Sequence, residues 1–351
     1  MNVGIIGLGA IGGPLAARLL RTRPVGETIA LAAGSERNVI SLRETGLRVE
    51  EGGQKTATPA PGGKLLGGVL PVLDAPYDLI LLCTRTDAIE AALASAAQLL
   101  GPAGALVCVQ NGLPEARAAA VVGADRTLGT VIGWSSSSDG PGSYQVTSAG
   151  RLTLGSFSPA GAKNVPAALA LLQRAAPTKV TGNLAGSRWS KLALNCAMST
   201  IGTVAGLNLG GLAARADARL LAMRVVGEVV QVGLAHGVRF ERVAGVDPAW
   251  LGEASAGGAR NALARPLRHA LLWAACQPHR KQRSGMLARL EQGRPAGQID
   301  DLNGAVVEAG KKVGRGAPVN ARLVEIVHAI ERGEQKIGVH QIGSALGPDG
   351  N

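Results

Sequence analysis

The sequence predicts a mixed α/β domain followed by an all-helical domain. Two observations support this expectation. Short apolar runs alternate with helical patterns in the first half of the chain, and from about residue 187 the periodicity is helical almost to the end. The length of 351 residues suits two domains, and 46% hydrophobic residues suffice for both cores. We expect the first domain at 1–183, the second at 184–345 and a frayed tail at 346–351.

The chain opens with an apolar run at 3–6, a glycine-rich turn and a helical pattern at 14–20. Gly7 allows a tight turn, Gly9 lets the backbone approach a pyrophosphate, and Gly12 lets the helix pack closely on the strand. An anion would then sit on the free N–H groups at the helix start. The alternative is a purely structural strand-to-helix turn. The candidate cofactor-binding residues here are Gly7, Leu8, Gly9, Ala10, Ile11 and Gly12.

Further buried strands are expected at 28–33, 78–84 and 105–110, with a helix at 88–100. This alternation predicts a doubly wound parallel sheet of the Rossmann type, which binds its ligand beyond the carboxyl ends of the strands. Those ends carry Gly7, Gly34, Thr84 and Asn111. Residues 130–160 are expected to extend the same sheet with antiparallel strands.

The second domain is expected to hold the substrate and, where the chain forms a homodimer, the dimer interface. Its helices are predicted near 187–204, 214–237, 257–276, 298–313 and 320–332. Asn320 is the predicted N-cap of the last helix, and Gly333 its stop.

Composition excludes several classes of protein. Only 2% of residues are aromatic, which disfavours a stacking surface for nucleic-acid bases, so we expect no nucleic-acid partner. The net charge of +11 suits acidic ligands such as phosphorylated cofactors and carboxylates.

The apolar start is too short for a membrane span and is a poor signal peptide, so we expect a cytoplasmic protein without a membrane partner. We expect reduced thiols and no metal site, because the four cysteines lie far apart in the sequence: Cys83, Cys108, Cys196 and Cys276.

A polar stripe in the second domain suggests chemistry. Lys191, Asn195 and Ser199 recur every four residues on an otherwise apolar helix. A solvated helix face is the plain interpretation. The alternative is a carbonyl-reducing site, because an ammonium group can stabilise the oxygen that gains negative charge and can donate a proton to it.

The sequence resembles the ketopantoate reductase family. The resemblance is carried by the glycine-rich turn and, in order along the chain, by Gln110-Asn111-Gly112-Leu113, Lys191-x-x-x-Asn195, Gln298-Ile-Asp-Asp-Leu-Asn303-Gly304 and Pro318-x-Asn320. It implies NADPH-dependent reduction of a 2-oxo acid to the 2-hydroxy acid, with the substrate between the two domains. By this resemblance Lys191 is the general acid, Asn111 serves the nicotinamide and the substrate, and Asn195 binds a substrate hydroxyl. The remaining candidate substrate-binding residues are Ser199, Ser284 and Asn208.

The departures from the family pattern fall on the substrate side. Gln298, the third candidate catalytic residue, replaces a glutamate and follows an apparent extra residue within 294–297. Ser199 replaces an asparagine, and Ser284 belongs to a Ser-Gly-Met sequence where the family has Ser-Met. Two other functions therefore stay open: a specialised-metabolism relative that reduces a different ketone or imine, and a catalytically silent NADPH-binding sensor or scaffold. The retention of Lys191 and Asn195 argues against the silent protein.

Cofactor choice depends on the residues after the second strand. Ser35, Arg37 and Arg85 are candidates for binding the 2′-phosphate of NADPH. Glu36 argues the other way, because an acid near this position can accept a hydrogen bond from a free ribose hydroxyl. We expect NADPH.

Overall fold

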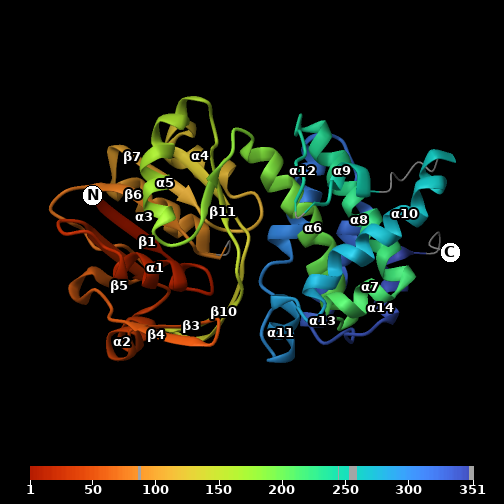
Figure 1. Cartoon of the computed structure of the whole chain (residues 1–351), viewed down its shortest axis with the longest axis horizontal. Helices are drawn as coiled ribbons and strands as arrows, with labels where there is room; N and C mark the ends of the chain where they lie inside the picture. The colour runs from red at the N-terminus through yellow and green to blue at the C-terminus, as the bar shows by residue number, and fades with distance from the viewer. Residues whose placement is uncertain (86–87, 244, 253–258, 348–351) are drawn as a thin grey trace. The chain divides into compact units, whose positions relative to one another are not determined.

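The computed structural model describes residues 1–85, 88–243, 245–252 and 259–347. The chain divides into two compact units, Met1–Leu184 and Ala185–Asn351 (Figure 1). This boundary lies one residue after the predicted one. Residue 346 of the predicted tail ends a helix, and residues 348–351 lie outside the described part.

The N-terminal unit is built on an eight-stranded sheet with the order β12-β11-β8-β7-β6-β1-β2-β5. The neighbours are parallel, except that β11 runs antiparallel to β8. The strands are β1 (Asn2–Ile6), β2 (Thr28–Ala33), β5 (Leu65–Gly67), β6 (Tyr77–Leu82), β7 (Leu100–Cys108), β8 (Thr127–Ile132), β11 (Leu152–Ser156) and β12 (Thr178–Val180). The predicted parallel sheet is therefore confirmed.

Both faces of this sheet are covered. Ile5 belongs to one buried cluster together with Leu15, whereas Ile6 belongs to a second cluster together with Ile80. Successive residues of β1 thus enter different cores, which explains why the central strands are continuous apolar runs. The helices of this unit are α1 (Gly12–Arg21), α2 (Glu36–Thr45), α3 (Ile89–Leu99), α4 (Glu115–Val122) and α5 (Val165–Gln173).

The prediction that residues 130–160 extend the main sheet is only partly right, because some of them form a second sheet. Strands β8 and β11 do extend the main sheet, but β9 (Ser135–Gly140) and β10 (Ser143–Ser148) do not. They form a four-stranded sheet, β4-β3-β10-β9, with β3 (Leu47–Glu51) and β4 (Gln54–Thr58), and β10 runs parallel to β3. In β10, Tyr144 and Val146 are buried and Gln145 is exposed, the alternation of a sheet with one covered face.

The C-terminal unit is helical, as predicted. Its α-helices are α6 (Leu184–Ala205), α7 (Leu209–Ala214), α8 (Ala216–Ala235), α9 (Pro248–Leu251), α10 (Ala259–Cys276), α11 (Gly285–Glu291), α12 (Ala305–Lys312), α13 (Pro318–Glu331) and α14 (His340–Leu346). The helix predicted at 298–313 is present over 300–312, and its first segment, Asp300–Gly304, is π-helical and leads directly into α12. Residues 257–258 of another predicted helix lie outside the described residues.

The prediction that Asn320 is an N-cap is wrong. Helix α13 begins at Pro318, so Asn320 lies in its first turn and is fully buried. The carboxylate of Glu228, from α8, accepts hydrogen bonds from Val319 N and Asn320 N at 2.9 Å each. A distant side chain therefore satisfies the N–H groups that a local cap would otherwise bind. The stop at Gly333, with φ of 75°, is confirmed.

Candidate active site

The glycine-rich turn has the geometry that its spacing predicts. Gly7 has φ of 95°, and a Cβ atom there would lie 2.7 Å from Thr84 N. A Cβ atom on Gly12 would lie 1.9 Å from Gly7 O, so the helix could not approach the strand. A Cβ atom on Gly9 would meet nothing within 4 Å. The turn is therefore closed on the protein side at Gly7 and Gly12 and open at Gly9.

The first turn of α1 is suited to an anion. It contains no acidic residue, and Ile11 at the N-cap makes no side-chain hydrogen bond to it. No acidic side chain of this turn therefore neutralises the positive end of the helix dipole. A pyrophosphate would supply the negative charge.

The next strand ends lie beside this turn. Cys83 N donates to Ile6 O at 2.8 Å, and Val109 N donates to Leu82 O at 2.9 Å. The backbone hydrogen bonds between neighbouring strands thus continue to the carboxyl edge of the sheet. Just after the ends of β6 and β7, Gln110 Nε2 donates to Thr84 Oγ1 at 3.0 Å. Asn111 follows and is half-buried. The structure thus brings Asn111 to the sheet edge that carries the glycine-rich turn, where a doubly wound sheet binds its ligand.

The four residues that bear on the choice between NADPH and NADH differ in their contacts and exposure. Ser35 caps α2, and its Oγ accepts from Asn38 N at 3.3 Å. The carboxylate of Glu36 accepts from Gly67 N, at the end of β5, at 3.1 Å. Arg37 and Arg85 are exposed. Glu36 is therefore turned toward the neighbouring strand.

Lys191, Asn195 and Ser199 lie on one half-buried strip of α6, between residues that are buried. The predicted stripe is thus present on the helix. Burial and, to a smaller extent, the positive charge of Arg188 together lower the pKa of Lys191 to about 7. A lysine with a pKa near neutrality can exist in either protonation state at physiological pH, as proton transfer requires.

The start of α6 is fixed by the segment that follows α8. Ser187 Oγ donates to the carboxylate of Glu241 at 2.5 Å, and Glu241 N donates to Ser190 Oγ at 2.8 Å. The ring of Trp189 lies 5.8 Å from that of His236. These contacts hold the turn of helix that contains Lys191.

The middle of α6 is held by a buried polar network, which we call the Asn303 network: Thr200, Glu228, Asn303 and Asn320. Asn303 Nδ2 donates to Cys196 O at 3.3 Å and to Asn320 Oδ1 at 2.9 Å, and Thr200 Oγ1 donates to Asn303 Oδ1 at 2.6 Å. Asn320 Nδ2 donates to Glu228 at 2.8 Å. Burial raises the pKa of Glu228, although the hydrogen bonds it accepts oppose this shift. The motif residues Asn303 and Asn320 therefore support the helix that carries Lys191, a role that their sequence positions did not indicate.

The other candidate substrate-binding residues have structural partners. Thr203 Oγ1 lies 2.8 Å from Ser284 Oγ and 2.7 Å from Ser199 O. Ser284 also caps α11, and Asn208 caps α7 by accepting from Gly211 N at 2.8 Å. Gln298 has an exposed side chain just before the π-helical segment. The structure therefore links Ser284 to the α6 strip and gives Asn208 a capping role.

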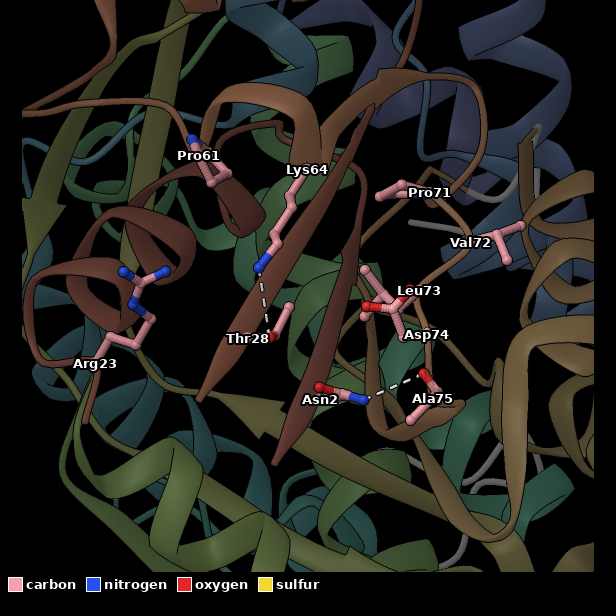
Figure 2. A pocket seen from close by; sticks show the side chains of 10 residues that line it. All are labelled: Asn2, Arg23, Thr28, Pro61, Lys64, Pro71, Val72, Leu73, Asp74 and Ala75. Carbon is pink, nitrogen blue, oxygen red and sulfur yellow. Dashed lines mark hydrogen bonds between the residues drawn. The ribbon is translucent and has the colours of Figure 1, made fainter. Parts of the chain in front are cut away.

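A cavity of about 770 Å³ lies elsewhere in the N-terminal unit. Asn2 and Thr28, the first residues of β1 and β2, line it (Figure 2). It therefore lies at the edge opposite the glycine-rich turn, which follows the last residue of β1. Lys64 Nζ lies 3.5 Å from Thr28 Oγ1, and Asn2 Nδ2 donates to Ala75 O at 3.1 Å. Its position excludes this cavity as the dinucleotide site predicted at the carboxyl edge.

Within residues 1–85, 88–243, 245–252 and 259–347, no group of three His, Cys, Asp or Glu side chains is placed to hold a metal ion. The four cysteines carry free thiols; Cys83 is half-buried and the others are buried. No helix in these ranges is both long and apolar enough to span a membrane.

A Rossmann-type sheet with an open glycine-rich turn, followed by a helical unit with a lysine of lowered pKa, is typical of dinucleotide-dependent oxidoreductases. Residues 3–159 match the family model Ketopantoate reductase PanE/ApbA, and residues 183–331 match its C-terminal counterpart. The chain belongs to the ketopantoate reductase family. Members of this family are oxidoreductases that act on a CH–OH/C=O group.

Relatives match over nearly their whole length. The 2-dehydropantoate 2-reductase of Mesorhizobium japonicum is 26% identical, with 95% of this chain and 99% of the relative covered. That of Pyrococcus horikoshii is 25% identical, with 94% and 98% covered. Similar solved structures include D-mandelate dehydrogenase with NADH and anilino(oxo)acetate (TM-score 0.78, 21% identity, 95% and 99% covered). Another is a ketopantoate reductase of Ralstonia eutropha (TM-score 0.71, 23% identity, 96% and 100% covered). These two similarities establish the fold.

Proposed function

We propose that this chain reduces a 2-oxo acid to the 2-hydroxy acid with NADPH, as a 2-dehydropantoate 2-reductase of pantothenate biosynthesis. The observation that carries the proposal is Lys191, a half-buried lysine with a pKa of about 7 on the polar strip of α6. A solvated helix face gives no reason for such a shift. The names of the relatives support the same substrate class.

The proposed mechanism assigns the proton to Lys191. Bound NADPH supplies the hydride for the carbonyl carbon. As the carbonyl oxygen gains negative charge, the Lys191 ammonium stabilises it and donates a proton to it. Asn195, one turn further along α6, binds a substrate hydroxyl, while Asn111 orients the nicotinamide and the substrate. The lowered pKa makes Lys191 a better proton donor than an ordinary lysine.

The direct test is turnover with a panel of 2-oxo acids. Purified protein is incubated with NADPH and ketopantoate, pyruvate or phenylglyoxylate, and the loss of nicotinamide absorbance is followed. We expect ketopantoate to give the highest kcat/KM. A higher value for another acid would indicate a specialised relative. No oxidation of NADPH with any of them, despite NADPH binding, would indicate a silent binding protein.

We propose NADPH rather than NADH because Glu36 is engaged by Gly67 N, whereas Arg37 is exposed after the second strand. Arg37→Ala is expected to raise the Kd of NADPH about tenfold, since a charge-assisted bond to the 2′-phosphate is lost, and to leave the Kd of NADH unchanged. Glu36→Gln is the matched control and should change neither Kd. Calorimetry measures both. Equal affinity of the wild type for the two cofactors, or weaker NADH binding by Glu36→Gln, would contradict the assignment.

Gln298 bears on the identity of the substrate. If this residue reflects a different substrate, Gln298→Glu is expected to raise kcat/KM for ketopantoate about tenfold, because a charged acceptor binds a hydroxyl more strongly than a neutral one. Gln292→Glu adds the same charge at another exposed position of the same unit and should have no effect. High wild-type activity on ketopantoate with no gain in Gln298→Glu would show that the glutamine is a tolerated replacement.

We further propose a homodimer formed through the helical unit. Large apolar side chains are exposed there: Trp250, Leu267 and Trp273, with exposed fractions of 37%, 62% and 52%. Exposed tryptophan and leucine side chains favour association because burying them is favourable. Light scattering after gel filtration is expected to give twice the mass of the chain. A monomer at micromolar concentration would refute the proposal.

A further inference from the structure

Tyr144 stands out among the residues that contact the glycine-rich turn, because it comes from the second sheet. Its hydroxyl donates to Leu8 O at 2.8 Å. Its ring fills the space beside Gly13, where a Cβ atom would lie 2.1 Å from the ring carbon Cζ. Gly13 is not one of the three glycines of the dinucleotide pattern, and its φ is not in the left-handed region. This glycine therefore makes room for the Tyr144 ring.

The bond to Leu8 O fixes the orientation of the peptide group between Leu8 and Gly9. A trans peptide is planar, so its C=O and N–H groups point in opposite directions. With the carbonyl directed toward Tyr144, the N–H group of Gly9 is directed away from it. Gly9 is also the glycine with open space around its Cβ position. The hydrogen bond to the carbonyl further polarises the peptide and strengthens its N–H as a donor.

We propose that Tyr144 is a positioning residue for cofactor binding, which orients the N–H group of Gly9 toward the pyrophosphate. This inference rests on the proposed function, since it requires a dinucleotide at the turn. The second sheet is thereby part of the cofactor site, although its strands lie outside the parallel sheet. Burial raises the pKa of Tyr144 to about 12, so the phenol stays protonated and remains a donor at physiological pH.

A second contact supports this role of the second sheet. Arg18, at the far end of α1, forms an ion pair with Glu51 of β3 at 2.7 Å and lies 5.6 Å from the ring centre of Trp134. Helix α1 is thus attached to the second sheet near both of its ends.

Tyr144→Phe tests the proposal, because it keeps the ring and removes only the hydroxyl. We expect the Kd values of NADPH and of 2′-phospho-ADP-ribose, which both contain the pyrophosphate, to rise by a common factor of about 2 to 12. The Kd of 2′-AMP, which lacks the pyrophosphate, should not change. In turnover, KM for NADPH should rise while kcat stays the same. Calorimetry and initial rates give these values.

Tyr77→Phe is the matched control. Tyr77, the other tyrosine of the chain, donates to Pro71 O at 2.6 Å in the same unit, away from the glycine-rich turn. Its loss should leave all three Kd values unchanged. If Tyr144→Phe and the wild type bind NADPH equally, or if 2′-AMP binding weakens by the same factor, the inference is overturned. If the wild type binds no NADPH, the proposed cofactor site fails, and the inference fails with it.

Gly13→Ala gives an independent test with the hydroxyl in place. The added methyl group should displace the ring and weaken NADPH binding. Combining Gly13→Ala with Tyr144→Ala should relieve the clash and raise the melting temperature above that of Gly13→Ala alone, without restoring NADPH affinity. Restored affinity in the double variant would show that Tyr144 only fills space.

Discussion

Lys191→Ala is expected to lower kcat for 2-oxo acid reduction by about 10²- to 10⁴-fold. The Kd of NADPH should change little, because the ammonium group acts on the carbonyl oxygen and not on the pyrophosphate. Steady-state kinetics and calorimetry separate the two effects. A variant that keeps most of its kcat would remove Lys191 from the mechanism and leave the polar strip of α6 as a solvated face.

The pH dependence gives this prediction a second readout. With a pKa of about 7, Lys191 carries its proton below pH 7 and loses it above. For reduction, kcat/KM should therefore be constant at low pH and fall about tenfold per pH unit above 7. Oxidation of the hydroxy acid needs the neutral amine, so it should rise with pH through the same range. Lys191→Arg, which stays charged, should abolish this titration.

Asn303→Ala is expected to lower the free energy of unfolding of the helical unit by about 2–3 kcal/mol. The substitution leaves the hydroxyl of Thr200 and the side-chain oxygen of Asn320 without their partner inside a fully buried site. Denaturant unfolding followed by tryptophan fluorescence measures the loss, because three of the four tryptophans lie in this unit: Trp189, Trp250 and Trp273.

Asn208→Ala is the control for Asn303→Ala. Asn208 is an exposed helix cap with one hydrogen bond, so its loss should cost about 1 kcal/mol. Equal losses in the two variants would show that the Asn303 network adds nothing beyond one ordinary hydrogen bond. A larger loss in Asn303→Ala, together with reduced kcat, would agree with its support of α6.

The parallel sheet and the glycine-rich turn were predictable because local patterns encode them. A strand buried on both faces must be a continuous apolar run, as in β1. The turn needs glycines at fixed positions for steric reasons, and the clashes at Gly7 and Gly12 show those reasons directly. The polar strip of α6 was predictable from spacing alone, because α-helical periodicity places every fourth residue on one face.

The second sheet and the Asn303 network were not predictable in this way. Strand β3 pairs with β10, which follows it by about ninety residues, and neither strand has the continuous apolar pattern of a central strand. Asn320 has the residue type and position of a helix cap, but the distant Glu228 takes over that task. In both cases the deciding partner lies far away in sequence, and only the tertiary structure identifies it.

The distance between Leu8 and Tyr144 has a consequence for synthesis on the ribosome. The two residues are 136 positions apart, so the glycine-rich turn leaves the exit tunnel long before the residue that contacts it. At about 5–20 residues per second, the delay is roughly 7 to 27 s. During that time the nascent turn lacks the bond to Leu8 O. On the proposed role of Tyr144, a growing chain gains its full affinity for the dinucleotide only after β10 has emerged and paired with β3.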